Sequence, residues 1–249
     1  MPFFDVVIPA RNEEPTIGSV VRMALQSRGV GKVIVVDDGS TDGTASVASA
    51  AGAEVLQSRG SADKGLALET GVAAATEPVI VFFDADILNV TPSHFESLAA
   101  PVVNGGYAMC CGLVDYGVVR NPLFLRLPPI TGLRALRREI FEAIRPDRRN
   151  GFQIEIMINE VVARGGLPSA IRVLHGAGHR SKVEKSGWRR GGRAHLAMTL
   201  ELLDCFRFVP LWTYWSYLRN LDILRGSEHI SVSGAFGRVD DASKLFLRP

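Results

Sequence analysis

The stretch that decides the fold is VIVFFDADI, residues 79–87. Five apolar residues in a row are followed by two aspartates, Asp84 and Asp86, separated by a single residue. A run that is apolar on both faces predicts a strand buried on both sides, as in the centre of a parallel sheet. The two acids therefore lie at the carboxyl end of that strand, where ligands bind in open α/β sheets.

The spacing of the two aspartates favours a metal site. Because side chains alternate along an extended strand, Asp84 and Asp86 are expected on the same side, with Ala85 facing away between them. Two carboxylates held this close repel unless a cation lies between them, and such hard oxygen ligands suit Mg²⁺ or Mn²⁺, with a diphosphate completing the shell. From this stretch alone, a strand-end turn with two solvated aspartates is an equal alternative.

The residues before this strand alternate between strand and helix patterns. Such alternation gives right-handed crossovers and a doubly wound sheet. No GxGxxG follows the first strand and no GxxxxGK[ST] occurs, so neither a dinucleotide-binding fold nor a P-loop enzyme is supported. The expected strands cover residues 3–8, 32–36 and 53–56, with helical patterns between them, the last over residues 66–76.

After residue 87 the pattern is less regular. The final part, residues 196–224, mixes aromatic and apolar residues with a few charges, which indicates one or two amphipathic helices. These helices pack on the domain, pair between subunits or lie on a bilayer. The other expected elements are strands at 107–114 and 170–174, helices at 133–144 and within 151–163, and a basic, glycine-rich loop after 174.

Composition and charge narrow the range of partners. The chain has 249 residues, is 47% hydrophobic and carries a formal net charge of only +2. Residues 134–193 nevertheless hold 14 Lys and Arg against 6 Asp and Glu. A basic block of this kind can meet anionic lipid or a phosphorylated small molecule. It lacks interleaved aromatic residues, so we expect no nucleic-acid partner.

Cysteine usage and the N-terminal sequence bear on the compartment. Cys110, Cys111 and Cys205 fit neither a disulfide framework nor a metal-ligand spacing, which favours a reducing cytosol. The N-terminus enters a strand pattern directly, without a basic n-region. No apolar run is long enough to span a bilayer. We expect a cytoplasmic protein and leave contact with the inner face of a membrane open.

Four motifs stand in a fixed order: VVIPARNEE at the first strand, VIVVDDGSTDGT at the second, KG at the third helix and FFDAD at the fourth strand. Together they resemble the family 2 glycosyltransferases with the GT-A fold. The resemblance covers residues 5–87 well. In the second half, ITGLRALRREI followed by GFQIEI looks like the polyprenyl-phosphate glycosyltransferases of that family and, more distantly, like glucosyl-phosphoglycerate synthases.

This resemblance implies an α/β fold of the GT-A type: a Rossmann-like, mostly parallel sheet with helices on both faces, followed by a C-terminal helical tail. The glycosyltransferase domain is expected over residues 1–195. Within it, residues 1–106 form the nucleotide-sugar-binding half and residues 107–195 the acceptor half. Residues 196–249 form the tail.

The resemblance also assigns the residues that bind the donor. Asp38 is the acid that hydrogen-bonds the base, and Asp84 with Ala85 belongs to the DxD motif that binds ribose and metal. Asp86 is the metal ligand of that motif, and Mn²⁺ or Mg²⁺ is the expected ion. The remaining donor residues lie in the first-strand loop and in the segment that closes over the nucleotide: Pro9, Ala10, Arg11, Glu13, Lys64 and Gly65.

Three further roles concern the metal and the acceptor. His179 lies where related enzymes often supply a metal-binding histidine, and His175 is its competitor. Glu155 is the candidate base that removes the proton of an acceptor hydroxyl. With a phosphate acceptor it would instead orient the substrate. The acceptor-binding candidates are Thr131, Gly132 and Arg134, with Arg137 and Arg138 at helical spacing and Arg180, Lys182 and Lys185 in the basic loop.

The leading hypothesis is a metal-dependent glycosyltransferase that uses a UDP- or GDP-sugar, with a phosphorylated or polyprenyl-phosphate acceptor slightly favoured. The alternative is a soluble small-molecule acceptor, either phosphoglycerate-like or a natural-product aglycone. A non-catalytic nucleotide-binding module is a further alternative. Retention or inversion of the anomeric configuration, a homodimer and peripheral membrane contact all stay open.

Overall fold

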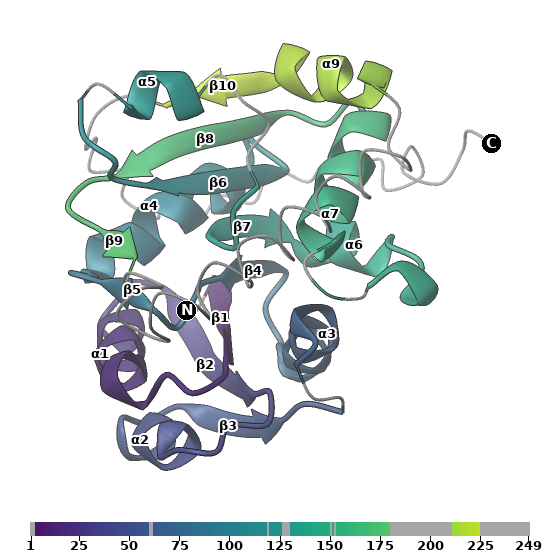
Figure 1. Ribbon diagram of the computed structural model, residues 1–249. Coiled ribbons are helices and arrows are strands. Elements are labelled where there is room, and N and C mark those ends of the chain that lie inside the picture. The colour runs from purple at the N-terminus through teal and green to yellow at the C-terminus, as the bar shows by residue number, and fades with distance from the viewer. Residues whose placement is uncertain are drawn as a thin grey trace, which may run out of the picture.

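The computed structural model describes residues 3–59, 62–118, 120–125, 130–149, 151, 153–179 and 211–224. These residues form three layers, with an eight-stranded sheet between two layers of helices (Figure 1). The α/β class, the mostly parallel sheet and the helices on both faces are confirmed.

The sheet has the strand order β10-β8-β6-β7-β4-β1-β2-β3. Only β7 runs antiparallel to its neighbours β4 and β6, and every other pairing in this sheet is parallel. A second, two-stranded sheet pairs β5 with β9. The strands are β1 (Phe4–Ala10), β2 (Val30–Asp37), β3 (Glu54–Gln57), β4 (Val79–Phe82), β5 (Ile87–Leu88), β6 (Met109–Val114), β7 (Arg134–Arg137), β8 (Ser169–Leu174), β9 (Gly178–His179) and β10 (Leu221–Ile223).

The helices divide between the two faces. Buried residues of α1, α2 and α4 pack on one face, and buried residues of α3, α6, α7 and α9 pack on the other. The helices are α1 (Glu14–Leu25), α2 (Thr44–Ala50), α3 (Lys64–Ala74), α4 (Pro92–Val103), α5 (Asn121–Phe124), α6 (Arg138–Glu142), α7 (Gln153–Arg164) and α9 (Leu211–Arg219), with a 3-10 turn η1 (Pro146–Arg148).

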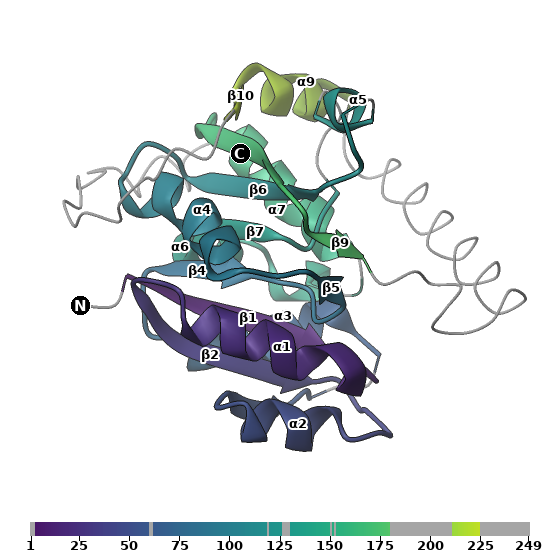
Figure 2. The same ribbon diagram turned by 90° about the vertical axis from the view of Figure 1, so that its left-hand side faces the viewer.

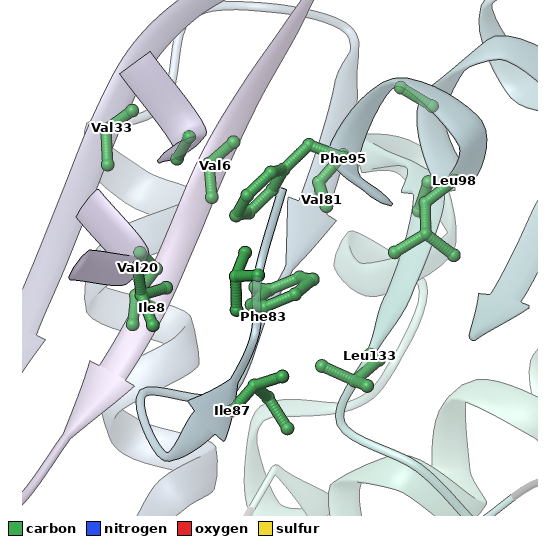
Figure 3. Close-up of a cluster of buried hydrophobic side chains, with 14 of the residues drawn as sticks. Val6, Ile8, Val20, Val33, Val81, Phe83, Ile87, Phe95, Leu98 and Leu133 are labelled. Atoms are coloured by element: carbon green, nitrogen blue, oxygen red, sulfur yellow. The ribbon is translucent and has the colours of Figure 1, made fainter. Parts of the chain in front are cut away.

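The core beneath the aspartate pair is aromatic. Phe83 and Phe95 lie with ring centroids 4.3 Å apart, between β1 and the start of β7 (Figure 3). Both side chains have no exposed surface. This packing holds the backbone that leads into Asp84, so the acids start from a rigid position.

The expected helix over residues 133–144 is wrong in its first part. Residues 134–137 form β7, and only residues 138–142 form a helix. Ala135 packs in the core of one face and Leu136 in the core of the other. A strand buried on both faces shows no alternation of apolar and polar residues, so the helical spacing of the arginines was misleading.

The tail contributes to the main sheet. Residues 211–219 form α9 against α7, and residues 221–223 form β10 beside β8. Tyr217 is 2% exposed, whereas Trp215 is 76% exposed. Residues 170–174 are therefore not the last strand of the chain. The other residues of the expected tail lie outside the described part, within which no helix combines the length and apolar character of a bilayer crossing.

Helix α3 approaches β1 so closely that only glycine fits at residue 71. A Cβ at Gly71 would overlap the side chain of Val7. We expect Gly71→Ala to lower the free energy of unfolding by about 1–2 kcal/mol, because overpacking outweighs the gain in helix propensity. Urea denaturation measures this.

The matched control is Gly106→Ala, whose Cβ would meet only the Pro101 carbonyl oxygen, at 3.8 Å. Its stability should stay within about 0.5 kcal/mol of the unchanged protein. A Gly71→Ala protein as stable as this control would contradict the packing described.

Candidate active site

The sequence-predicted residues meet at one edge of the main sheet. Strands β1, β2, β4 and β8 end at this edge and β7 begins there, because β7 runs in the opposite direction. Strand β9 pairs with β5 next to it (Figure 2). Residues far apart in the sequence, such as Asp86 and His179, are thereby brought together.

Two loops at this edge, after β1 and after β2, are tied to each other. The Asn12 backbone N donates to Ser40 Oγ at 3.0 Å, and Asn12 Oδ1 accepts from Thr41 N at 2.8 Å. Glu14 Oε2 accepts from Gly43 N at 2.9 Å. These hydrogen bonds fix the loop that carries Arg11 and Glu13, directly after Pro9 and Ala10 at the end of β1, against the loop that carries Asp38.

Asp38 offers an unsatisfied acceptor at the base of these loops. It is 6% exposed, and its Oδ1 atom has no hydrogen-bond partner. Burial raises the pKa of its carboxyl group, against the opposing effects of a hydrogen bond from Ser58 and the charge of Arg11. A buried acceptor without a donor is costly, and a ligand N–H would remove that cost.

Lys64 lies between two carboxylates. Its Nζ atom is 2.9 Å from Asp84 Oδ1 and 2.8 Å from Glu155 Oε1. Burial opposes the charge of the ammonium, but the two carboxylates outweigh it and raise the pKa of Lys64. Lys64 is the first residue of α3, and the Asp63 carboxylate caps this helix by accepting from the Gly65 backbone N at 2.9 Å.

Gly132 closes over this ion pair. A Cβ at this residue would overlap both the Asp84 carboxylate and the Lys64 ammonium. The neighbouring Thr131 hydroxyl donates to the Gly112 carbonyl at 3.0 Å and accepts from Leu133 N at 3.1 Å. The segment that leads into β7 is therefore held directly above the lysine, and only glycine fits there.

The sequence pattern predicted that Asp84 and Asp86 share one side of an extended strand. The structure shows that they do not. Strand β4 ends at Phe82, and Ala85 and Asp86 lie in a turn before β5. Asp84 contacts Lys64, whereas the Asp86 Oδ1 atom lies 3.7 Å from the Nδ1 atom of His179. Asp84 therefore lies against Lys64, and Asp86 lies against His179. Because the two carboxylates face different partners, the repulsion between them is reduced.

Asp86 and His179 can hold a divalent ion together. Two ligands of one ion, each about 2.1 Å from it, lie about 3–4 Å apart, and a carboxylate oxygen with an imidazole nitrogen suits Mn²⁺. In the described part of the chain, no group of three His, Cys, Asp or Glu side chains is placed to hold an ion. The pair therefore fits an ion whose remaining ligands come from a substrate.

Arg134 does not reach into the site. It is 1% exposed, and its guanidinium donates to the Thr131 and Glu155 carbonyl oxygens and to Asn159 Oδ1. Its position is inside β7, which the helical prediction did not foresee. Arg138 likewise donates to main-chain carbonyls of α3 and its C-terminus. Arg180, Lys182 and Lys185 lie outside the described residues.

Comparison with known proteins places these residues in a family. The model of the family described as glycosyl transferase family 2 matches residues 5–158. Glucosyl-3-phosphoglycerate synthase of Mycolicibacterium smegmatis is 37% identical over 128 residues, covering 47% of this chain and 41% of that protein. The 4,4'-diaponeurosporenoate glycosyltransferase of Staphylococcus aureus is 40% identical over 98 residues, covering 37% and 26%. The chain thus matches less than half the length of these curated relatives.

Solved structures resemble a larger share of the chain. Glucosyl-3-phosphoglycerate synthase from Mycobacterium tuberculosis, in complex with Mn²⁺, UDP-glucose and phosphoglyceric acid, superposes with a TM-score of 0.60 at 30% identity. The match covers 73% of this chain and 72% of that one. The same synthase with Mg²⁺ and UDP superposes with a TM-score of 0.61.

The lysine between Asp84 and Glu155 should be essential to the stability of the site. We expect Lys64→Met to lower the free energy of unfolding by about 3 kcal/mol, because it leaves two poorly exposed carboxylates without their shared cation. The control is Lys32→Met, since the Lys32–Glu54 pair is well exposed. That change should cost less than about 1 kcal/mol. Equal losses in thermal or urea unfolding would contradict this account.

Proposed function

Because the chain belongs to glycosyl transferase family 2, we propose that it transfers a sugar from a UDP-sugar to an acceptor with the help of Mn²⁺ or Mg²⁺. The observation that carries the proposal is the approach of Asp86 to His179, 3.7 Å apart, beside the Asp84–Lys64–Glu155 cluster. The neighbouring synthase structures that contain UDP together with Mn²⁺ or Mg²⁺ support the choice of donor and ion.

In this proposal the two tied loops bind the nucleoside. The unsatisfied Oδ1 atom of Asp38 accepts an N–H of the base. Pro9 and Ala10, at the end of β1, and Arg11 and Glu13, in the loop after it, border the base and ribose. The hydrogen bonds of Asn12 and Glu14 hold this loop in place before the donor arrives. Little ordering is then needed on binding.

The metal pair and the lysine act on the diphosphate. Asp86 and His179 would hold the ion, which when bound supplies Lewis-acid stabilisation of the negative charge that develops on the departing UDP. Lys64 lies on the far side of Asp84 and adds a second positive charge close to the same region. Gly65 and Ala85 present backbone rather than bulky side chains next to these groups.

Glu155 links the donor site to the acceptor side. Its Oε1 atom is 2.8 Å from Lys64 Nζ, so it lies beside the group that neutralises the diphosphate. In an inverting reaction this carboxylate would take the proton of the acceptor hydroxyl. Arg134 holds the first turn of α7 through the Glu155 carbonyl, and in this role it positions Glu155 rather than binding the acceptor.

For the acceptor we propose a phosphorylated small molecule. Relatives from mycobacteria are named for phosphoglycerate, and the solved structure of one contains phosphoglyceric acid beside UDP-glucose. The surplus of arginine and lysine in residues 134–193 is suited to such an anion. These observations favour the phosphoglycerate-like alternative of the sequence analysis over a polyprenyl phosphate, which was one of the two acceptors in the leading hypothesis.

An apolar acceptor is the second candidate, and one observation favours it. Four apolar residues are exposed, Tyr116, Val118, Phe124 and Ile130. The rings of Tyr116 and Phe124 are in contact, with centroids 4.9 Å apart and planes tilted by 42°. These residues flank the segment that leads to Thr131 and Gly132 above the site. The S. aureus relative is named for an apolar acid, diaponeurosporenoate. A natural-product aglycone or a lipid phosphate would use such a surface.

The metal pair gives the sharpest test of activity. We expect Asp86→Asn to lower Mn²⁺-dependent release of UDP from a UDP-sugar about 1,000-fold, because an amide is a poor ligand for the ion. Binding of UDP in the presence of a chelator should be unchanged by calorimetry. The control is Asp147→Asn, which removes only an exposed pair with Arg145. If the Asp86→Asn protein released UDP as fast as the unchanged protein, the proposed mechanism would be contradicted.

The identity of the acceptor is tested with a panel of three acceptor molecules. UDP release from UDP-glucose is measured with 3-phosphoglycerate, with an apolar hydroxylated or carboxylated aglycone, and with a polyprenyl phosphate in detergent. We expect acceptor-dependent release with the first. Release only with the second or third would replace the leading acceptor by the apolar one. No release with any donor and acceptor, together with tight UDP binding, would favour a non-catalytic nucleotide-binding module. The anomeric NMR signal of the product gives the stereochemistry.

A further inference from the structure

We propose that Asp115 is a positioning residue that fixes the metal ligand His179 and, with the same carboxylate, the exposed segment on the acceptor side. Asp115 follows the last residue of β6, at the edge of the sheet where the site lies. It was not among the residues that the sequence singled out. The inference rests on the proposed function, since it concerns the ion held by Asp86 and His179.

On the metal side, Asp115 holds the turn between β8 and β9. The Asp115 backbone N donates to the Ala177 carbonyl at 2.9 Å. Its Oδ2 atom accepts from the Gly176 backbone N at 3.3 Å and lies 3.4 Å from His175 Nδ1. His179 comes two residues after this turn and pairs with Ile87 across β5 and β9. The position of the turn therefore sets how far His179 reaches toward Asp86.

On the acceptor side, the other oxygen of the same carboxylate holds the segment after β6. Asp115 Oδ1 accepts from the Gly117 backbone N and from Asn121 Nδ2, both at 2.9 Å. Asn121 is 8% exposed, and its Oδ1 atom accepts from the Tyr116 backbone N at 2.9 Å. This arrangement fixes the backbone next to the contacting rings of Tyr116 and Phe124.

Both oxygens of the Asp115 carboxylate are needed as acceptors, one for each of the two segments that it holds. Hydrogen bonds from Asn121 and from the Gly117 and Gly176 amides hold the pKa of Asp115 down, at about 2. The group is therefore ionised at neutral pH. An amide in its place keeps the shape but turns one acceptor into a donor, which then faces an N–H group. One of the two segments must move.

The two loops are consequently coupled through one side chain. A shift of the segment after β6, for example when an acceptor contacts Tyr116, displaces the carboxylate that holds the turn before His179. The same linkage would act in reverse, from the turn to the segment after β6, if Asp86 and His179 held an ion. His175, the competitor for the metal role, then serves as a partner of Asp115 at the turn.

The experiment titrates Mn²⁺ into the full chain with UDP present, by calorimetry and by the Mn²⁺ electron paramagnetic resonance signal. We expect Asp115→Asn to weaken Mn²⁺ binding about tenfold, as for other residues that orient a metal ligand. UDP affinity in a chelator should match the unchanged protein. Asp147→Asn is the matched control and should bind Mn²⁺ normally. Unchanged Mn²⁺ affinity in a folded Asp115→Asn protein would overturn the inference.

Two further variants test the two sides of Asp115 separately: the turn before His179 and the segment after β6. They also test the proposal if Asp115→Asn does not fold. His175→Ala should weaken Mn²⁺ binding about threefold and raise the KM of the acceptor less than Asn121→Ala does. Asn121→Ala should raise the acceptor KM and weaken Mn²⁺ binding less than His175→Ala does. Equal losses of chelator-insensitive UDP binding in these variants would point to a general structural defect and overturn the positioning role. If the unchanged protein itself binds no Mn²⁺ with UDP, the proposed function falls, and this inference with it.

Discussion

The placement of negative charge at one edge of the sheet is the constraint on which the site depends. Asp38, Asp84, Asp86, Asp115 and Glu155 gather where parallel strands end, and each would be destabilising without a partner. The negative charge of each carboxylate is balanced in a different way. Lys64 serves Asp84 and Glu155 together, His179 lies beside Asp86, and four donors from two loops surround Asp115. Asp38 differs from them, because its buried Oδ1 atom has no hydrogen-bond partner.

The first half of the chain could be predicted from the sequence because each of its signals is local. Alternating strand and helix patterns, and the two acids after an apolar run, identified the edge of the sheet at which Asp84 and Asp86 lie. What could not be predicted is the direction of each acid, because it depends on residues far along the chain. Asp84 turns toward a lysine twenty residues before it, and Asp86 toward a histidine delivered by a strand pairing of only two residues.

The second half was predicted less well, for a physical reason. Strand β7 is buried on both faces, so its sequence carries no alternation, and its first residue is an arginine. A fully buried guanidinium is tolerated only when carbonyl and amide oxygens receive its donors, as they do for Arg134. The sequence around Arg134 does not predict which carbonyl and amide oxygens will accept its hydrogen bonds. The curated relatives named above match less than half of the chain, 47% and 37% of it.

Strand β10 has a consequence for the solubility of shortened forms of the chain. It covers the outer side of β8 with three paired residues, and the Tyr107 hydroxyl donates to Asp222 Oδ2 at 3.0 Å to hold it there. Removal of residues 211–224 would leave the hydrogen-bonding groups of β8 open to any other extended chain. A protein that lacks these residues would then carry an unpaired strand edge, which promotes aggregation.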